Sequence, residues 1–123
     1  MITQYGKDRL YARGRMKAGT LNKTESAYAL YLQAEKQAGR VIQFWFEAVK
    51  LKVADGACWY TPDFVVLRPD GMIELHEVKG SPKIFQDDAK VKVKSVATQV
   101  PFRCFVVFPR AKRDGGGWDV EEY

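Results

Sequence analysis

The stretch YTPDFVVLRPDGMIELHEVKG, residues 60–80, predicts a β-hairpin that decides the rest of the fold. Two runs rich in apolar and β-branched residues, 64–67 and 72–79, flank the turn RPDG at 68–71. Proline suits the second position of such a turn, and glycine suits the last. We expect a three-residue loop in which Gly71 takes the left-handed conformation and forms a bulge, and this loop fixes the register of the two strands.

The predicted register gathers charged side chains at one end of the hairpin. Val65 should face Leu75, and Asp63 should face Glu77, with Lys79 next along the same side. A shift of one residue would instead send Asp63 to the opposite face of the sheet from Glu77. In the expected register, the apolar side of the hairpin ends in two carboxylates and a lysine.

The opposed carboxylates of Asp63 and Glu77 indicate a cation site. Like charges directly opposite each other destabilise a sheet, so this arrangement needs compensation. Mg²⁺ commonly binds one or two carboxylates, several waters and phosphate oxygens. Lys79 would lie where it can contact a water molecule or the scissile phosphate. The arrangement favours metal-assisted hydrolysis of a phosphodiester bond, in which the metal activates water and neutralises charge in the transition state.

Composition limits the alternatives. The chain has 123 residues, of which 46% are hydrophobic, and this predicts one globular domain with one core. Its net charge of +5 favours a polyanionic partner, because cationic side chains release the counterions of a nucleic acid. One histidine and two cysteines do not suffice for a Cys/His zinc cluster or for a mechanism with two histidines. Any catalysis must therefore rest on carboxylates and lysines.

The cysteines and the apolar runs indicate the compartment. Cys58 and Cys104 are far apart in sequence and lie beside aromatic residues, as buried free thiols do. This pattern is typical of a reducing environment. The sequence has no apolar run as long as a membrane span, and its start lacks a secretory signal. We expect a cytoplasmic protein without a membrane partner.

The N-terminal part divides into a basic arm and a helix. Residues 1–19 are rich in Lys and Arg, with glycines breaking any periodicity, and they predict a flexible arm ahead of a single domain at 20–123. Asn22 and Glu25 form a predicted capping box, and Gly39 ends the helix that follows. The apolar residues that recur at helical spacing are Ala27, Leu30, Tyr31, Ala34 and Ala38.

The remaining elements complete a mixed sheet. Residues 41–53 predict one long strand or a hairpin, and a second helix begins after 81–82. The apolar period of that helix is carried by Phe85, Ala89, Val93, Val96 and Val100. A strand at 102–108 follows, and a helix between two strands normally returns the chain parallel to the first strand. We expect an α/β fold with a mixed central β-sheet flanked by helices, and the pattern does not assign residues 118–123.

The hairpin also resembles a known superfamily of nucleases. Residues 60–64, YTPDF, followed by 77–80, EVKG, are similar to the PD-(D/E)XK signature, and the resemblance extends over residues 20–108. It implies a restriction-endonuclease-like core, most similar to small phage-encoded endonucleases and Holliday junction resolvases. For a phage-encoded protein, the compartment would be the cytoplasm of the bacterial host.

The resemblance also implies roles for the residues. Asp63 and Glu77 would bind Mg²⁺ or Mn²⁺, and Lys79 would position or activate water. The backbone carbonyl of Val78 would be an extra ligand, and Glu25 would be an additional acid carried by the helix. Glu25 is equally well explained by its capping box, so both interpretations of this residue stay open.

We expect the substrate to be DNA, double-stranded or branched. We expect an endonuclease that recognises a DNA structure and works as a homodimer. RNA cleavage and exonuclease activity also stay open. The alternative is a non-catalytic DNA-binding phage accessory protein of the same fold, although two opposed carboxylates would repel phosphate. Candidate DNA contacts are Arg13, Arg15, Lys17, Lys23, Lys83, Lys90 and Lys94.

Two further interpretations concern residues outside the predicted site. His76 alternates with Glu77 along the strand, so it should project to the other side of the sheet and serve the structure. The aromatic side chains of Trp45, Trp59 and Tyr60 are interpreted as core or as walls of the site rather than as platforms for base stacking.

Overall fold

A five-stranded mixed sheet in the order β1-β4-β5-β6-β7 forms the centre of the molecule, and a separate two-stranded sheet is formed by β2 and β3. We describe a computed structural model, which covers residues 21–52, 59–81 and 87–123. The elements in chain order are α2 (Lys23–Gln37), β1 (Gln43–Phe46), β2 (Leu51–Lys52), β3 (Trp59–Tyr60), β4 (Phe64–Leu67), β5 (Ile73–Val78), α3 (Asp87–Gln99), β6 (Arg103–Pro109), the short 3-10 helix η2 (Lys112–Asp114) and β7 (Trp118–Glu122).

The predicted hairpin and its register are confirmed. Strands β4 and β5 pair antiparallel with Val65 opposite Leu75. The turn between them closes with the Arg68 N–H donating to the Met72 carbonyl at 2.9 Å. Gly71 has φ 85°, the left-handed conformation that the loop requires and that glycine adopts without strain.

The predicted parallel return is also confirmed. Helix α3 connects β5 to β6, and β6 runs parallel to β5, with Glu77 opposite Val106. Strand β7 then pairs antiparallel with β6 and forms one edge of the sheet. The pattern of residues 118–123 did not predict β7, because four of its five residues are exposed and the alternation of apolar and acidic residues in WDVEE is too short to identify a strand.

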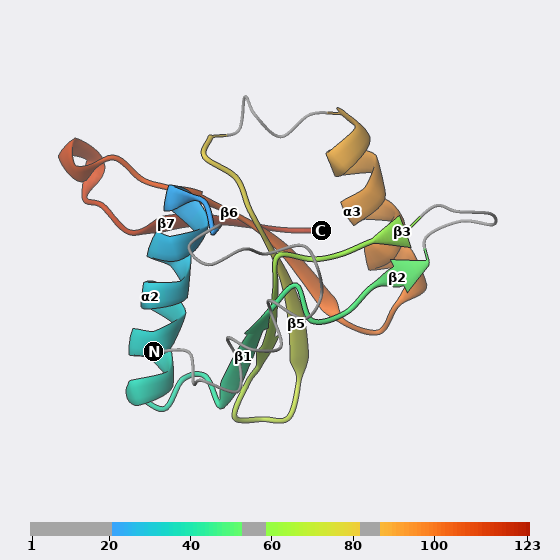
Figure 1. The fold of residues 1–123 in the computed structure, drawn as a ribbon, viewed down its shortest axis with the longest axis horizontal. Coiled ribbons are helices and arrows are strands. Elements are labelled where there is room, and N and C mark those ends of the chain that lie inside the picture. Colours follow the sequence, from blue (N-terminus) through green and yellow to red (C-terminus); the bar gives the residue numbers. More distant parts are fainter. Residues whose placement is uncertain (1–20, 53–58, 82–86) are drawn as a thin grey trace.

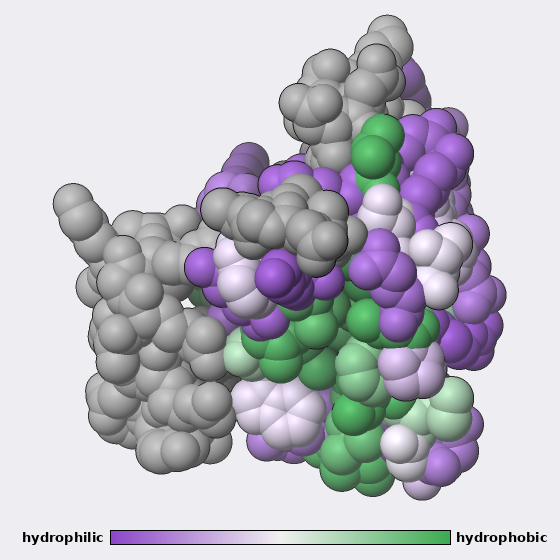
Figure 2. Space-filling model, turned by 90° about the vertical axis from the view of Figure 1, so that its right-hand side faces the viewer, coloured by the Kyte–Doolittle hydropathy of each residue, from purple (hydrophilic) through white to green (hydrophobic). Residues whose placement is uncertain are grey.

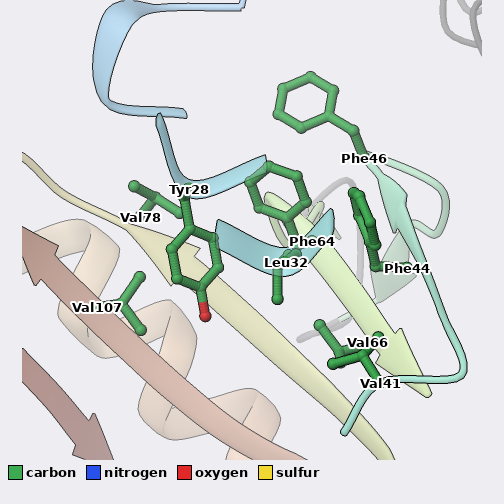
Figure 3. Packing of buried hydrophobic residues seen from close by; sticks show 9 residues of the cluster. All are labelled: Tyr28, Leu32, Val41, Phe44, Phe46, Phe64, Val66, Val78 and Val107. Atoms are coloured by element: carbon green, nitrogen blue, oxygen red, sulfur yellow. The ribbon is translucent and has the colours of Figure 1, made fainter. Parts of the chain in front are cut away.

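The two faces of the sheet carry two cores. Helix α2 covers one face, and α3 lies on the other side together with β2 and β3 (Figure 1). Under α2, the side chains of Tyr28 and Leu32 lie beside Phe64 of β4 (Figure 3). The Tyr28 and Phe64 rings meet edge to face with centroids 5.5 Å apart. Burial of each of these side chains stabilises the fold by about 1.5–3 kcal/mol.

The second core forms beneath α3, where the predicted apolar period of this helix is confirmed at Val93 and Val96. Residues 82–86, including Phe85, lie outside the described residues. Cys104 is a buried free thiol in this core, as expected, whereas Cys58 lies outside the described residues. The surface on this side of the molecule combines a hydrophobic centre with hydrophilic residues around it (Figure 2).

The predicted first helix is confirmed as α2, but the apolar residues that marked its period are not the residues that it buries. Leu30 is 72% exposed and Tyr31 is 40% exposed, whereas Tyr28 and Leu32 are the buried residues of α2. The predicted stripe depended largely on alanines, which bury little apolar area. The helix instead turns toward the sheet the face on which a large aromatic and a leucine follow each other one turn apart.

The prediction of one long strand or hairpin over residues 41–53 is also wrong. Strand β1 ends at Phe46, and Glu47 takes a left-handed φ of 49° that turns the chain out of the sheet. The next strand, β2, pairs with β3 in the separate small sheet. The density of β-branched and aromatic residues therefore predicted strand structure without locating the break.

Candidate functional site

Four segments of the chain meet at one end of the main sheet. They are the first turn of α2, the residue after β1, the residue before β4 and the last residues of β5 (Figure 1). Each contributes an acid to this region: Glu25, Glu47, Asp63 and Glu77. Lys79 follows directly after β5.

Asp63 lies where the β4–β5 ladder ends. Phe64 and His76 are the last paired residues, so Asp63 and Glu77 occupy the next position in the predicted register. The Val78 N–H donates to Asp63 Oδ2 at 2.8 Å, and the Glu47 N–H donates to the Asp63 carbonyl at 2.8 Å. Asp63 therefore connects the ends of β1 and β5 through both its side chain and its backbone.

The electrostatic environment of Asp63 opposes its ionisation. Burial raises the pKa of Asp63 to about 8, and the neighbouring negative charge of Glu77 adds to the increase. The Val78 N–H and the Lys79 ammonium lower the pKa of Asp63 but do not offset the burial. The site therefore favours a proton or another cation at Asp63 near neutral pH.

Glu77 is buried, with 7% of the residue exposed, and both of its carboxylate oxygens have partners. The Tyr60 hydroxyl donates to Oε1 at 2.7 Å, and Lys79 Nζ lies 3.2 Å from Oε2. Burial, followed by the charge of Glu77, raises the pKa of Tyr60, so its hydroxyl remains a neutral donor. The Lys79 side chain is 24% exposed and can contact both Glu77 and a molecule in the solvent.

Glu25 occupies its predicted capping position and also faces the other acids. The Glu25 N–H donates to Asn22 Oδ1 at 2.8 Å, and the Asn22 N–H donates to Glu25 Oε1 at 3.1 Å, which confirms the capping box. One carboxylate oxygen each from Glu25, Glu47 and Asp63 lies within 4.8 Å of the others. A donor set made only of carboxylate oxygens suits hard divalent cations such as Mg²⁺ and Mn²⁺.

The fold thus brings together the residues that the sequence indicated, namely Asp63, Glu77, Val78, Lys79 and Glu25. Sequence reasoning missed Glu47. Glu47 lies between the aromatic run of β1 and Ala48. A charged residue in such an apolar stretch is expected to be buried only where it serves a specific role, and this was the signal that could have identified it. The interpretation of Tyr60 as core or site wall fits its position, because its ring lies in the second core and its hydroxyl contacts Glu77.

His76 has the structural role expected of it. It lies on the α2 side of the sheet, where Nδ1 shares a hydrogen bond with the Tyr28 hydroxyl and Nε2 lies 2.9 Å from Glu74 Oε1. Arg68 Nε also donates to Glu74 Oε1, at 3.0 Å. Burial lowers the pKa of His76, which favours the neutral ring.

The candidate DNA contacts are only partly described by the structure. Lys23, Lys90 and Lys94 are exposed, as a surface that binds phosphate requires. Four further candidates, together with the predicted arm at 1–19, lie outside the described residues: Arg13, Arg15, Lys17 and Lys83.

Comparison of the chain with models of protein families, with curated proteins and with solved structures finds no match. Across residues 21–52, 59–81 and 87–123, no helix combines the length and apolar character needed to cross a membrane.

Proposed function

We propose that this protein is a divalent-metal-dependent DNA endonuclease with a restriction-endonuclease-like core. The observation that carries the proposal is the convergence of Glu25, Glu47 and Asp63 within 4.8 Å, beside the pair of Glu77 and Lys79. Carboxylates at this separation repel one another when charged, and the pKa of Asp63 is raised by burial first and then by the charges of Glu77 and Glu25. A bound cation would offset this repulsion.

The residues present fit Mg²⁺ or Mn²⁺. Asp63, Glu77, Glu25 and the Val78 carbonyl would hold the ion, and the geometry adds Glu47 to this set. When bound, such an ion activates a water molecule and neutralises charge on a phosphate. Because the acids come from four segments that are separate in sequence, only the folded chain assembles the site.

Lys79 and Tyr60 have complementary tasks in this proposal. Lys79 follows directly after the central strand β5, and its partly exposed ammonium can donate to a phosphate oxygen or orient a water while it remains near Glu77 Oε2. Tyr60 holds the other oxygen of Glu77 from inside the core. The acid is thereby fixed in orientation before substrate arrives, which reduces the reorganisation needed during reaction.

The proposed substrate is double-stranded or branched DNA, and cleavage depends on DNA structure. The net charge of +5 supports a nucleic-acid partner, because it provides counterion release on binding. A domain of this size has little surface for reading a long base sequence. A homodimer would supply two sites for the paired cuts that resolve a branched substrate.

One observation favours the rival function of a non-catalytic DNA-binding protein. Both oxygens of Glu77 already have partners within the chain, so this acid is satisfied without an ion. The acidic cluster, formed by Glu25, Glu47, Asp63 and Glu77, argues against the rival function, since carboxylates that face a phosphate weaken binding.

The test is cleavage of linear, nicked, flapped and four-way DNA by the full chain with Mg²⁺ or Mn²⁺. We expect Asp63→Asn, Glu77→Gln and Lys79→Met to reduce cleavage by at least about a hundredfold while DNA binding survives. Glu74→Gln is the matched control, because Glu74 is a buried acid of the same strand that contacts His76 on the other face. Wild-type cleavage by Asp63→Asn would overturn the site, and DNA binding without cleavage by the native chain would favour the rival.

A further inference from the structure

The small sheet of β2 and β3 has an inner and an outer face. Leu51 pairs with Tyr60 and Lys52 pairs with Trp59, and among the described residues neither strand is hydrogen-bonded in a ladder with any other strand. Leu51 and Tyr60 belong to the second core. Because side chains alternate along a strand, Lys52 and Trp59 project from the outer face, and both are exposed.

Trp59 does not contribute its full area to the core, in contrast to the interpretation from sequence. Its residue surface is 40% exposed, and Lys50 Nζ lies 5.2 Å from the centroid of its ring. An indole left partly in water with an ammonium held against it combines the two elements that bind single-stranded nucleic acid. These are an aromatic ring for base stacking and a cation for the adjacent phosphate.

The described charges on the hairpin and the residues leading into it are positive. Lys50 and Lys52 are the ionisable residues of 48–52 and 59–60, apart from tyrosine. Helix α3 lies beside β3 (Figure 1), and after Asp87 and Asp88 at its start it carries lysines and no further acid. Figure 2 views this side of the molecule. The exposed lysines of the helix are Lys90, Lys92 and Lys94.

The hairpin also borders the candidate site. Trp59 directly precedes Tyr60, whose hydroxyl donates to Glu77 at 2.7 Å. A strand of nucleic acid bound to the hairpin would therefore lie near the acidic cluster. The bases of an intact duplex are stacked on both faces, so only an unpaired base can stack on an indole at this position.

We propose that the outer face of the β2–β3 hairpin binds an unpaired stretch of substrate DNA, with a base stacked on Trp59 and the adjoining phosphates held by Lys50 and Lys52. This inference rests on the proposed function and narrows it. The substrate would have a single-stranded segment next to the cleaved bond, as flapped and branched DNA do and continuous duplex does not.

The test measures binding of the full chain to short fluorescein-labelled oligo(dT) in EDTA, where cleavage cannot interfere. Trp59→Ala should weaken binding by at least about fivefold, the lower end of the contribution of one stacked base. Matched duplex of the same length should lose less than twofold from this change. The exposed tryptophan of β1 offers the control, because Trp45→Ala removes an indole that is 36% exposed on a different sheet.

The lysines are tested by salt dependence. Lys50→Gln with Lys52→Gln should lower the slope of log affinity against log salt by up to about 1.4, since each phosphate contact with a single strand contributes about 0.7. Lys36→Gln with Lys112→Gln removes equal charge from α2 and η2 and should leave this slope unchanged. An equal decrease of this slope in both double-lysine variants would overturn the proposal. Full oligo(dT) affinity in Trp59→Ala would also overturn it.

The outcomes separate this inference from the proposed function. Binding of oligo(dT) that depends on Trp59, in a chain that cleaves no DNA with Mg²⁺ or Mn²⁺, would retain the binding surface and overturn the nuclease. Cleavage of flapped DNA that Trp59→Ala and the lysine pair leave unchanged would retain the nuclease and overturn the surface. Circular dichroism of each variant verifies that the chain remains folded.

Discussion

The Tyr60 hydroxyl donates to Glu77 Oε1 at 2.7 Å across the boundary between the second core and the acidic site. Tyr60 belongs to the small sheet and Glu77 to the central strand β5, so this bond joins the two sheets at the candidate centre. The remaining oxygen of Glu77 lies near Lys79. The carboxylate is thus oriented from both sides, which is the expected role of residues that surround a metal ligand.

We predict that Tyr60→Phe weakens Mn²⁺ binding by about tenfold or more, because Glu77 loses the donor that fixes its orientation. Tyr28→Phe is the matched control. It also removes a buried hydroxyl from a buried partner, but that partner is His76 on the opposite face. Both changes should cost similar stability, about 1–3 kcal/mol. Calorimetric titration with Mn²⁺ distinguishes them, and equal affinities for the two variants would contradict a positioning role for Tyr60.

We predict that the metal-free protein loses stability as pH rises from about 4 to about 8. The pKa of Asp63 is raised from 3.8 to about 8 in the folded state, mainly by burial. Between these values the folded chain binds a proton that the unfolded chain has released, so the free energy of unfolding falls with rising pH. Below and above this window, Asp63 contributes no slope.

Asp63→Asn tests this prediction, because asparagine can still accept from the Val78 N–H but carries no charge. The variant should lack most of the slope and should be more stable than the native chain at pH 8 in EDTA. Urea unfolding at a series of pH values measures both quantities. The same slope in the variant and the native chain would assign the pH dependence to other groups.

We predict that Leu32→Ala destabilises the fold by about 2–5 kcal/mol, whereas Leu30→Ala changes stability by less than about 0.5 kcal/mol. The two leucines share helix α2, but Leu32 is fully buried and Leu30 is 72% exposed. Thermal and urea unfolding of both variants measure the difference. A larger loss in Leu30→Ala would mean that the helix packs through the stripe that the sequence suggested.

The hairpin was predictable because its determinants are local. Gly71 and Pro69 fix the turn, and the turn fixes which residue of β4 faces which residue of β5. From that register the proximity of Asp63 to Glu77 follows without any other part of the fold. The capping box of Asn22 and Glu25 is local in the same sense.

The features that were missed depend on contacts between distant segments. Glu47 joins the site because the chain leaves the sheet after Phe46, and the Glu47 N–H donates to the carbonyl of Asp63, a residue distant in sequence. The buried face of α2 depends on which of its side chains pack against Phe64 of the sheet, and the periodicity of the helix carries no information about that partner. Strand β7 forms because β6 offers an unpaired edge.

The last prediction separates the two interpretations of Glu25, which the structure makes geometrically compatible. Its Oε1 accepts from the Asn22 N–H, and its carboxylate also lies within 4.8 Å of Asp63 and Glu47. Glu25→Gln keeps a side chain that can complete the capping box but removes the charge. Stability should change by only a few tenths of a kcal/mol, whereas Mn²⁺ affinity or turnover should fall by about tenfold or more, because a charged oxygen ligand is lost.

Asn22→Ala is the complementary variant, since it removes the cap and keeps the carboxylate. It should cost about 1 kcal/mol of stability and leave Mn²⁺ affinity within about twofold of the native value. Calorimetric Mn²⁺ titration gives the metal affinity of each variant, and urea unfolding gives the free energy of unfolding of each. Native affinity in Glu25→Gln would restrict this residue to its capping role and leave the ion to Asp63, Glu77 and their remaining neighbours.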